Sequence, residues 1–470
     1  MSETGLRPVD QPPQSIMAHP SPPYLRARKA KIQQSILRAE DALRELRTQL
    51  DAVESELSDV VYPVLEIPDE VTQQILAAAE LSELLVISAV CSQWRRIALG
   101  TKALWAHISL STAMTDLESL FFCFLDRAQD LAIHLTVLVT RPWSVPIAIL
   151  STAGRWKTAH FLPSPQDSLG QLYLPLDTGT SLDFGLLEEF TGTIPHLWPE
   201  LFSGASLLRS LACAAAELAL RFPVQNLTKL ELTVSSSVST LASLLRLTTR
   251  LEILIFGSAS FLEEGALDAE PFPVHEHLHT ISCERFMNDD IFQRLTVPAL
   301  KTIYLRSLHG VEALVECLSR SRCTLRVLYL ATIPPSGDLK HLLQSAACAS
   351  VRELILTVDD QMAAEDALEF YSNLAEGTYL PALKKLTLDL AFTVYLWPYV
   401  DAVAARARES PREQGTEDGP SVSKIEDFVV IFPIQEVRQQ VSDLDGLRRL
   451  ERVFGVKVLV PNGVPSFEKW

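Results

Sequence analysis

The sequence predicts an α/β solenoid of irregular repeats, preceded by a small all-α unit and an N-terminal heptad helix. Three observations support this fold class. A spaced apolar pattern recurs along the second half of the 470-residue chain. A segment of about 45 residues before it has the apolar spacing and the proline placement of several short helices. Still earlier, apolar residues follow one another at alternating three-residue and four-residue steps, which is a heptad pattern.

Composition limits the function classes. Apolar residues make up 47% and charged residues 21%, as in ordinary globular proteins. The net charge of −17 repels phosphate backbones and anionic lipids, so we expect no nucleic-acid and no membrane partner. No apolar stretch is long enough to span a bilayer, and the opening residues lack a signal pattern. We therefore expect an intracellular protein, cytoplasmic and/or nuclear.

The N-terminal region divides into two parts. Residues 1–28 form a proline-rich stretch without apolar periodicity, which predicts a disordered tail. Residues 29–61 predict a heptad helix, whose seam consists of Ile36, Ala39, Leu43, Leu46, Leu50, Val53, Leu57 and Val60. Because this stripe is narrow, it needs a partner surface. Two alternatives remain open: the helix folds back onto its own domain, or it forms a coiled coil and a homodimer through residues 32–60.

Residues 62–110 predict a small helical unit. The proline of Tyr62-Pro63 ends the preceding helix, and Pro68 stands at the start of the next one. Several of its short motifs carry a resemblance: Ile67-Pro68, Val90-Cys91-Ser92-Gln93-Trp94, Arg95-Arg96-Ile97-Ala98 and Leu104-Trp105. Together they resemble the F-box, the motif that binds the Skp-type adaptor of a cullin ubiquitin ligase. The chain departs from the family at Ala79-Glu80-Leu81, where the family has a large apolar residue followed by Asp-Pro.

The resemblance implies an adaptor-binding surface. The residues that it assigns to this surface are Ile67, Pro68, Val71, Ile75, Leu84, Leu85, Val90, Cys91 and Trp94. A helical unit this small has more apolar side chains than it can cover, so an outside partner also makes physical sense. The alternative is that these side chains pack against the first repeats. From the heptad helix onward, residues 30–460 resemble the F-box proteins of mushroom-forming fungi.

Residues 111–470 predict the solenoid, with a polar loop at 409–423. Its pattern is an apolar residue, two others, a second apolar residue, one other and a third apolar residue. The clear copies begin at Leu227, Leu251, Leu278, Leu300, Leu325, Val351, Leu383 and Ile425, and looser ones begin at Leu208 and Trp156. The first five intervals lie within the period of leucine-rich repeats. The asparagine that regular repeats place after the strand is missing, which predicts irregular repeats.

Side chains between the inward apolar residues of such strands point to the concave face. On three consecutive strands these residues are Tyr304, Tyr329 and Ile355, with Val327 close by. Because neighbouring strands lie about 4.8 Å apart, they predict a continuous aromatic and aliphatic patch for docking a protein. The alternative is that the C-terminal segment or the 409–423 loop covers it.

No catalytic motif is present: the sequence lacks a phosphate-binding loop, a G-x-G-x-x-G turn, G-x-S-x-G and H-E-x-x-H. The seven cysteines include no C-x-x-C pair, so we expect reduced thiols and neither disulfides nor a zinc site. His275, His277 and His279 alternate as metal ligands on a strand do, but solvated histidines are the favoured interpretation. We expect no metal and no cofactor.

These observations predict a non-enzymatic substrate receptor of a Skp–cullin–F-box ubiquitin ligase. The F-box would bind the Skp-type adaptor, and the repeats would hold a protein substrate close to the ubiquitin-carrying partner. A second hypothesis is a non-ligase interaction scaffold that dimerises through the coiled coil. A third is an enzyme with a shallow site on the repeats, for which only the histidine cluster argues.

Overall fold

The protein was analysed as a computed structural model. The structure describes residues 22–59, 67–78, 86–140, 143–163, 172–173, 182–192, 202–214, 216–233, 236–257, 261–262, 272–283, 289–306, 311–331, 336–358, 369–370, 372–374, 376–390, 423, 425–431 and 457–459. The chain divides into two compact units, residues 1–74 and 75–470. Most of the predicted 409–423 loop, together with Leu84, Leu85 and the Ala79-Glu80-Leu81 turn, lies outside the described residues.

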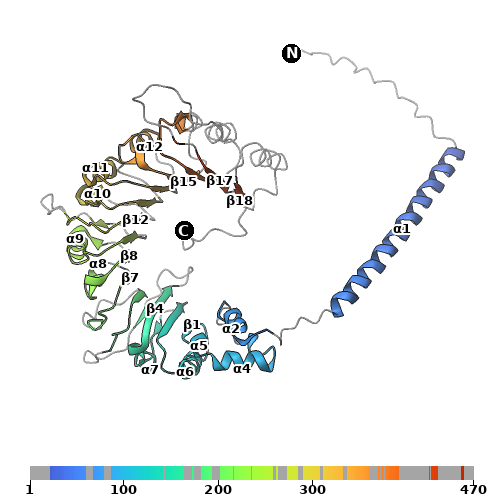
Figure 1. Cartoon of the computed structure of the whole chain (residues 1–470), viewed down its shortest axis with the longest axis horizontal. Helices are drawn as coiled ribbons and strands as arrows, with labels where there is room; N and C mark the ends of the chain where they lie inside the picture. Colours follow the sequence, from blue (N-terminus) through green and yellow to red (C-terminus); the bar gives the residue numbers. More distant parts are fainter. Residues whose placement is uncertain are drawn as a thin grey trace, which may run out of the picture. The chain divides into compact units, whose positions relative to one another are not determined.

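The first unit contains a long helix, α1, from Pro22 to Asp59 (Figure 1). It begins seven residues before the predicted start at residue 29, so the predicted tail is wrong for residues 22–28. Pro22 is well placed at a helix start, where its missing N–H is not needed, and the Arg, Lys and Ala residues that follow favour the helical state. No helix among the described residues is long and apolar enough to cross a membrane.

Among the described residues, three short helices follow: α2 at Asp69–Ala78, α4 at Ser92–Gly100 and α5 at Lys102–Trp105. The first turn of α2 carries Asp69 and Glu70, whose charges favour a helix N-terminus. Helix α4 is capped by Cys91, whose Sγ accepts a hydrogen bond from the Trp94 backbone N–H at 3.4 Å. The sequence thus folds here into the helices that its apolar spacing predicts.

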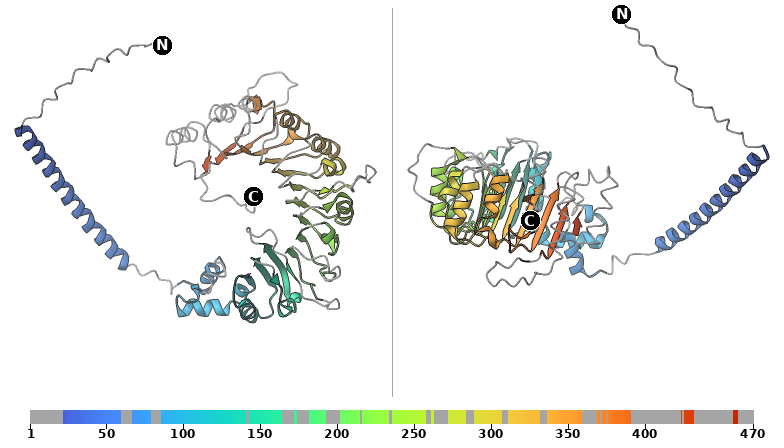
Figure 2. Two further views of the ribbon diagram at one scale, coloured as in Figure 1. Left: turned by 180° about the vertical axis from the view of Figure 1, so that it is seen from behind. Right: turned by 90° about the horizontal axis from the view of Figure 1, so that it is seen from above.

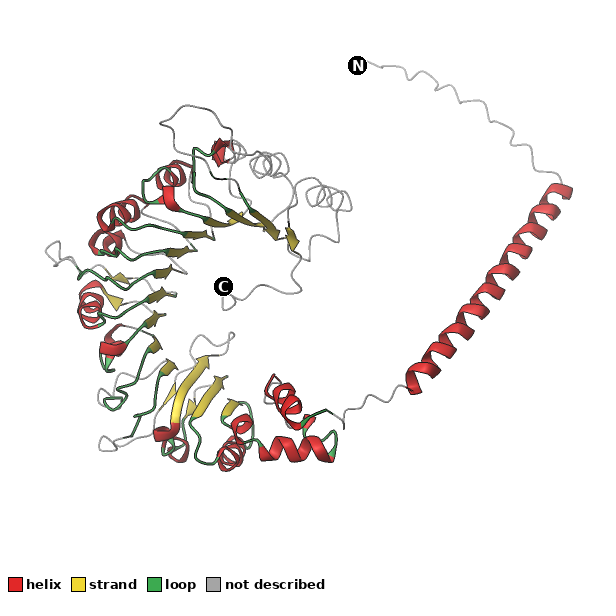
Figure 3. Ribbon diagram, viewed as in Figure 1, coloured by secondary structure: helices red, strands yellow, loops and turns green. Residues whose placement is uncertain are grey.

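Within residues 75–470, the central element is a curved 14-stranded sheet, with its strands along the inner side and helices along the outer side (Figures 1 and 3). All neighbouring strands run parallel. Its strands in spatial order are β1 (His107–Ser111), β2 (Ile133–Val139), β4 (Trp156–Pro163), β6 (Glu189–Gly192), β7 (Ser210–Cys213), β8 (Lys229–Leu232), β10 (Ile253–Phe256), β12 (Thr280–Cys283), β13 (Thr302–Leu305), β14 (Val327–Leu330), β15 (Glu353–Val358), β16 (Lys385–Leu390), β17 (Asp427–Ile431) and β18 (Lys457–Leu459). Sequential order equals spatial order, which is the topology of a solenoid.

Helical segments connect many of these strands and cover one face of the sheet (Figure 2). They are α6 (Leu117–Ala128), α7 (Ile147–Leu150), η2 (Ala153–Arg155), α8 (Ala216–Ala219), η3 (Val224–Asn226), α9 (Val238–Leu247), α10 (Asp289–Arg294), α11 (Val311–Ser321), α12 (Ser336–Leu343) and η4 (Cys348–Ser350). Two further pairs of strands form small parallel ladders, β3 (Trp143–Ser144) with β5 (Leu172–Tyr173), and β9 (Ser236–Ser237) with β11 (Phe261–Leu262). Consecutive helices α10, α11 and α12 pack against one another.

The core is a column of apolar side chains that runs from strand to strand. The strand register aligns Ile108, Leu135, Ala159, Phe190, Leu211, Leu230, Leu254, Ile281, Ile303, Leu328, Leu354 and Leu386. We call these residues the inner column. Each is at most 2% exposed. Because every strand buries its apolar face only against its neighbours, the fold is stabilised by stacking rather than by one central core.

The predicted apolar patterns fall on these strands. Every clear copy coincides with one strand from β8 to β17, and the looser copies at Leu208 and Trp156 coincide with β7 and β4. The arrangement is therefore solenoid-like, with a parallel sheet and helices. Strand β6 was missed because Gly192 occupies the third apolar position. Aromatic packing replaces leucine there, since Phe190 lies 5.1 Å from Phe202 and 5.5 Å from Phe222 between ring centroids.

Candidate functional site

Helix α2 carries an exposed apolar stripe. Val71 is 44% exposed and Ile75 is 42% exposed, one helical turn apart on the same face. On the other side of the helix, Leu76 is 1% exposed and belongs to the hydrophobic core. Pro68, which precedes the helix, is exposed, and Ile67 is half-buried. Four of the predicted adaptor-binding residues therefore leave some apolar surface open to solvent.

A second set of predicted residues surrounds the start of helix α4. Val90 is 62% exposed, whereas Cys91 and Trp94 are half-buried. The side chain of Cys91 serves as the helix cap described above, so substituting it would also alter the fold of α4. Trp94 packs against the hydrophobic core, and its buried indole N–H has no acceptor among the described residues. Such an unpaired donor is costly unless another group binds it.

Two exposed apolar residues in this region were missed by the sequence analysis. Val86 is 69% exposed and Leu99 is 45% exposed. Val86 follows Leu84-Leu85 directly, so it read as part of one continuous apolar run rather than as a separate surface residue. Leu99 lies next to two buried residues of α4, and only the orientation of that helix shows that it faces outward.

Trp105, at the end of helix α5, anchors the hydrophobic core beneath these helices. Trp105 is fully buried, and its indole N–H donates a 2.7 Å hydrogen bond to the Ala98 carbonyl. Its ring stacks on Phe124 at 5.4 Å, and the guanidinium carbon of Arg127 lies 4.3 Å from the ring centroid. A stacked pair and a cation–π contact each add to the burial of apolar area. The exposed apolar residues of α4 thus stand on a well-packed base.

Comparison with protein families agrees with this arrangement. A family model described as F-box-like matches residues 64–111. The chain contains an F-box-like domain. The match covers the helices α2, α4 and α5 and ends with strand β1. A search of curated proteins finds no match to the chain.

An F-box-like domain indicates a role in binding a Skp-type adaptor, and proteins with this domain are generally non-catalytic substrate adaptors. The domain is small relative to the chain, and its last residues form β1, the first strand of the sheet. Most of the sheet lies outside the matched residues, and its open face is a second surface to consider.

On the face of the sheet away from the helices, Tyr304 and Tyr329 lie side by side. The register pairs Tyr304 with Tyr329 and Tyr329 with Ile355, and the two tyrosine rings are 5.8 Å apart between centroids. Both tyrosines and Val327 are half-buried, but Ile355 is only 8% exposed. The Tyr329 hydroxyl lies 3.4 Å from the Thr357 hydroxyl. The accessible part of this patch therefore consists of Val327 and the two tyrosines.

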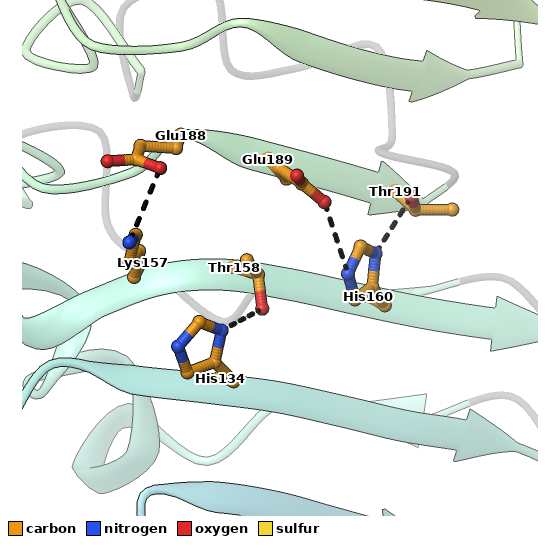
Figure 4. Close-up of polar contacts among 7 residues, drawn as sticks. All are labelled: His134, Lys157, Thr158, His160, Glu188, Glu189 and Thr191. Carbon is orange, nitrogen blue, oxygen red and sulfur yellow. Dashed lines mark hydrogen bonds and ion pairs between the residues drawn. The ribbon is translucent and has the colours of Figure 1, made fainter.

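A row of histidines occupies the same face nearer the F-box-like domain. His134 and His160 stand on neighbouring strands, and their Nδ1 atoms lie 3.2 Å from Thr158 Oγ1 and 3.0 Å from Thr191 Oγ1 (Figure 4). His160 Nε2 is 3.9 Å from a carboxylate oxygen of Glu189. On strand β1, the ring of His107 stacks on that of His134 at 4.4 Å. Sequence analysis missed this row because the histidines lie 26 or 27 residues apart, and only the register brings them together.

Burial lowers the pKa of His134 and of His160 below the ordinary histidine value. For His134, the neighbouring His107 lowers the pKa further, while Glu189 opposes the shift for His160. Both imidazoles are therefore held neutral to lower pH than a solvated histidine. Among the described residues, no cluster of three or more His, Cys, Asp or Glu side chains could hold a metal ion.

The three alternating histidines of the sequence do not form one site. His277 is exposed and His279 is half-buried, with Nε2 3.8 Å from Glu252. His275, in contrast, is 1% exposed, and neither ring nitrogen has a hydrogen-bond partner among the described residues. Burial lowers its pKa to about 4. The expectation that all three are solvated is therefore wrong for His275, because a bridge between Val274 and Thr296 and a 3.0 Å hydrogen bond from the His275 N–H to the Thr296 carbonyl hold its segment against the residues before β13.

All seven cysteines are free thiols in the structure. Five are buried, and burial raises the pKa of Cys317 and of Cys348 to about 11. Thiols with a raised pKa are poor nucleophiles and poor metal ligands. The five buried cysteines are therefore packing residues of the hydrophobic core.

Proposed function

We propose that the protein is the substrate-recognition subunit of a Skp–cullin–F-box ubiquitin ligase. The observation that carries this proposal is the F-box-like domain, whose helix α2 exposes Val71 and Ile75. Exposed aliphatic side chains on one helix face are suited to filling apolar pockets of a partner. The protein would contribute no chemistry of its own; it would hold a target near the ubiquitin-carrying enzyme.

The adaptor-binding set comprises Ile67, Pro68, Val71, Ile75, Leu84, Leu85, Val90, Cys91 and Trp94. Within it, we assign the direct contacts to Pro68, Val71, Ile75 and Val90, because these side chains are exposed. Trp94 is half-buried and packs against the hydrophobic core, so it would support these contacts by holding helix α4 in place.

Binding to a purified Skp-type adaptor tests this proposal. The variant Val71→Asp, Ile75→Asp places two charges on the exposed stripe of α2 and is expected to weaken binding on the order of 30-fold or more. The control is Gln73→Asp, Ala77→Asp, which adds the same charges at the same spacing on exposed positions of the same helix. Equal binding by wild type and both variants, or no binding by wild type, contradicts the proposal.

We further propose that the open face of the sheet binds the protein substrate. The accessible patch of Val327, Tyr304 and Tyr329 supports this assignment, because tyrosine is enriched at protein interfaces and the two rings lie side by side, tilted by 47° at a centroid distance of 5.8 Å. Ile355 lies beside Tyr329 on the same face, but it is buried and would not contact a partner directly. We expect the double variant Tyr304→Ser, Tyr329→Ser to lose one or more of the proteins that co-purify with wild type, and these lost proteins would be the substrates. If the double variant retains every protein that co-purifies with wild type, this assignment is contradicted.

A second function is favoured by one observation. The apolar seam of α1 is exposed, which suits a homodimeric scaffold. In that case the chain assembles through α1 and does not need a ligase. The irregular leucine-rich repeats and the similarity to F-box proteins of mushroom-forming fungi agree with either function. Adaptor binding in the assay above distinguishes the two, because the scaffold alone predicts none.

A further inference from the structure

Helix α1 exposes a longer apolar seam than the one predicted. The exposed fractions are 51% for Ile36, 52% for Leu43, 63% for Leu46, 56% for Leu50 and 51% for Val53. In the same heptad frame, Leu25 and Ile32 fall on the positions that continue the seam toward the N-terminus, and they are 46% and 51% exposed. From Leu25 to Val53 the helix thus presents an exposed seam of about four heptads, in which Lys29 takes one position.

The charges of α1 are strongly segregated along its length. Residues 22–38 contain five basic residues and no acidic one, whereas residues 39–59 contain seven acidic and two basic residues. The first turn carries no acidic residue and the last turn carries no basic residue. This order opposes the helix macrodipole, which favours acidic residues at the N-terminus and basic residues at the C-terminus. The charge order therefore destabilises a solitary helix.

We propose that α1 pairs with α1 of a second copy of this chain in an antiparallel coiled coil. The inference deepens the homodimer proposed above and gives it an orientation. An antiparallel pair places the basic half of each helix against the acidic half of the other, and it also opposes the two macrodipoles. A parallel pair would place the basic half of each helix beside the basic half of the other, and the acidic half beside the acidic half.

One register satisfies both the seam and the charges. With Asp41 at the two-fold axis, the facing seam positions of the two copies are Ile32 with Leu50, Ile36 with Leu46, Ala39 with Leu43, and Lys29 with Val53. Beside the seam, Arg26 of one helix then lies opposite Glu54 of the other, and Arg28 lies opposite Glu56. The symmetry repeats both pairs, so four opposite-charge pairs form. The overlap includes nearly all of α1.

The parallel alternative is worse at the same positions. In register, Lys29 would face Lys29 in the seam, and Arg28 would lie opposite Gln33, so no flanking pair of opposite charge forms. The antiparallel register has one unfavourable flanking pair, Glu40 with Glu40. Its favourable pairs outnumber this contact by four to one.

The orientation determines where the two chains leave the coiled coil. The C-terminal ends of the two helices lie at opposite ends of the antiparallel pair, about 50 Å apart at 1.5 Å of rise per residue. Each F-box-like domain follows one of these ends in the sequence. A dimer of this kind presents two adaptor-binding domains that do not share one end of the coiled coil.

Disulfide trapping in the full-length protein tests the orientation. A mixture of Ile32→Cys chains and Leu50→Cys chains, one carrying a size tag, is expected to form a mixed disulfide dimer on mild oxidation. Ile32→Cys alone is expected to form no more dimer than wild type, because in this register the two positions 32 lie about 27 Å apart along the axis. Efficient disulfide formation by Ile32→Cys alone, with none in the mixture, overturns the antiparallel orientation.

Charge-reversal variants provide a second, independent test of the orientation. Sedimentation equilibrium measures how strongly each variant dimerises. Arg26→Glu, Arg28→Glu is expected to raise the dimer dissociation constant by on the order of tenfold or more, and adding Glu54→Arg, Glu56→Arg is expected to restore it. A parallel dimer predicts no such loss for the first variant, because in that register Arg28 lies opposite Gln33 and the substitutions break no pair of opposite charges. If the wild-type protein is monomeric at tens of micromolar, the homodimer itself is overturned. That result would leave the proposed adaptor binding untouched, because adaptor binding is measured separately.

Discussion

The seam of α1 and the inner column of the sheet are both periodic apolar patterns, but they differ completely in burial. Leu46 in the seam is 63% exposed, whereas Leu328 in the inner column is fully buried. Each strand of the sheet has neighbours that carry the same pattern, so stacking covers its apolar face. Helix α1 repeats its pattern only along itself. The comparison shows that periodicity specifies the element, while burial depends on what lies beside it.

The F-box-like domain lies between these extremes. Leu76 on one side of α2 is buried, and Val71 and Ile75 on the other side are not. An apolar pattern of which the fold covers only one side leaves a surface for an outside partner. The predictions below test these differences in burial, from the largest expected effect to the smallest.

The largest effect is expected from Trp105→Ala, which removes the fully buried residue at the junction of α5 and the first strands. The substitution loses apolar burial, the stacking on Phe124 and the hydrogen bond to Ala98, so we expect a loss of about 3–5 kcal/mol in the free energy of unfolding. Urea denaturation followed by circular dichroism measures it. The control Leu99→Ala, at an exposed position, should change stability by less than about 0.5 kcal/mol. Equal losses for both variants contradict the buried position of Trp105.

The second prediction compares one leucine from each pattern. Leu328→Ala is expected to lower the free energy of unfolding by about 2–5 kcal/mol, because it leaves a cavity in the inner column. Leu46→Ala should leave the unfolding of residues 75–470 unchanged and should instead weaken the dimer. Denaturation and sedimentation measure the two effects separately. If Leu46→Ala destabilises the sheet as Leu328→Ala does, the seam is covered by the chain itself.

The third prediction concerns pH. The pKa of His275 is about 4 in the folded protein and near 6.5 when unfolded, so the unfolded state binds the proton first. Its contribution to stability is complete above pH 6.5 and is lost as the pH falls toward 4. This one group should cost about 2 kcal/mol between pH 7.5 and 5.

The variant His275→Phe should reduce the pH-dependent loss of stability by that amount, measured as the difference in urea midpoints at the two pH values. His277→Phe is the matched control, because His277 is exposed two residues away. A pH dependence that stays the same in His275→Phe would show that this histidine titrates as a solvated group.

The smallest effect is expected at the open face of the sheet. Lys385 and Glu353 form an ion pair across neighbouring strands, and their side chains are 34% and 26% exposed. Because the pair is partly solvated, Glu353→Gln should cost about 1 kcal/mol or less. Thermal unfolding at low and high salt measures it, and added salt should reduce the difference from wild type. A loss above about 3 kcal/mol would show a pair removed from solvent.

Much of the candidate site followed from the residues alone. The Pro68, Trp94 and Leu104-Trp105 motifs predicted the F-box-like domain, and the family comparison supports that resemblance at residues 64–111. The spaced apolar pattern predicted the strands because burial on one face demands period two. These features are local, so a short stretch of sequence contains the information that specifies them.

Other features depend on the register between distant strands. The histidine row comes together only because the register pairs His107 with His134 and places His160 two residues beyond Thr158, the partner of His134 on the next strand. Likewise, Ile355 has the same sequence position in its strand as Tyr329, but it is buried and the tyrosine is not. Burial of one residue in a repeat depends on what packs above it, and the repeat pattern does not contain that information.

The sequence by itself determined the α/β solenoid-like arrangement, the helical unit with its adaptor-binding motifs and the heptad helix, because each rests on periodicity or on contiguous residues. Only the tertiary structure decided that α1 begins at Pro22 and leaves its seam exposed, that Val86 and Leu99 face outward, and that His275 is buried with no hydrogen-bond partner among the described residues. The physical reason is that exposure is a property of neighbours in space. Periodicity shows which side chains share a face, and packing determines which faces are covered.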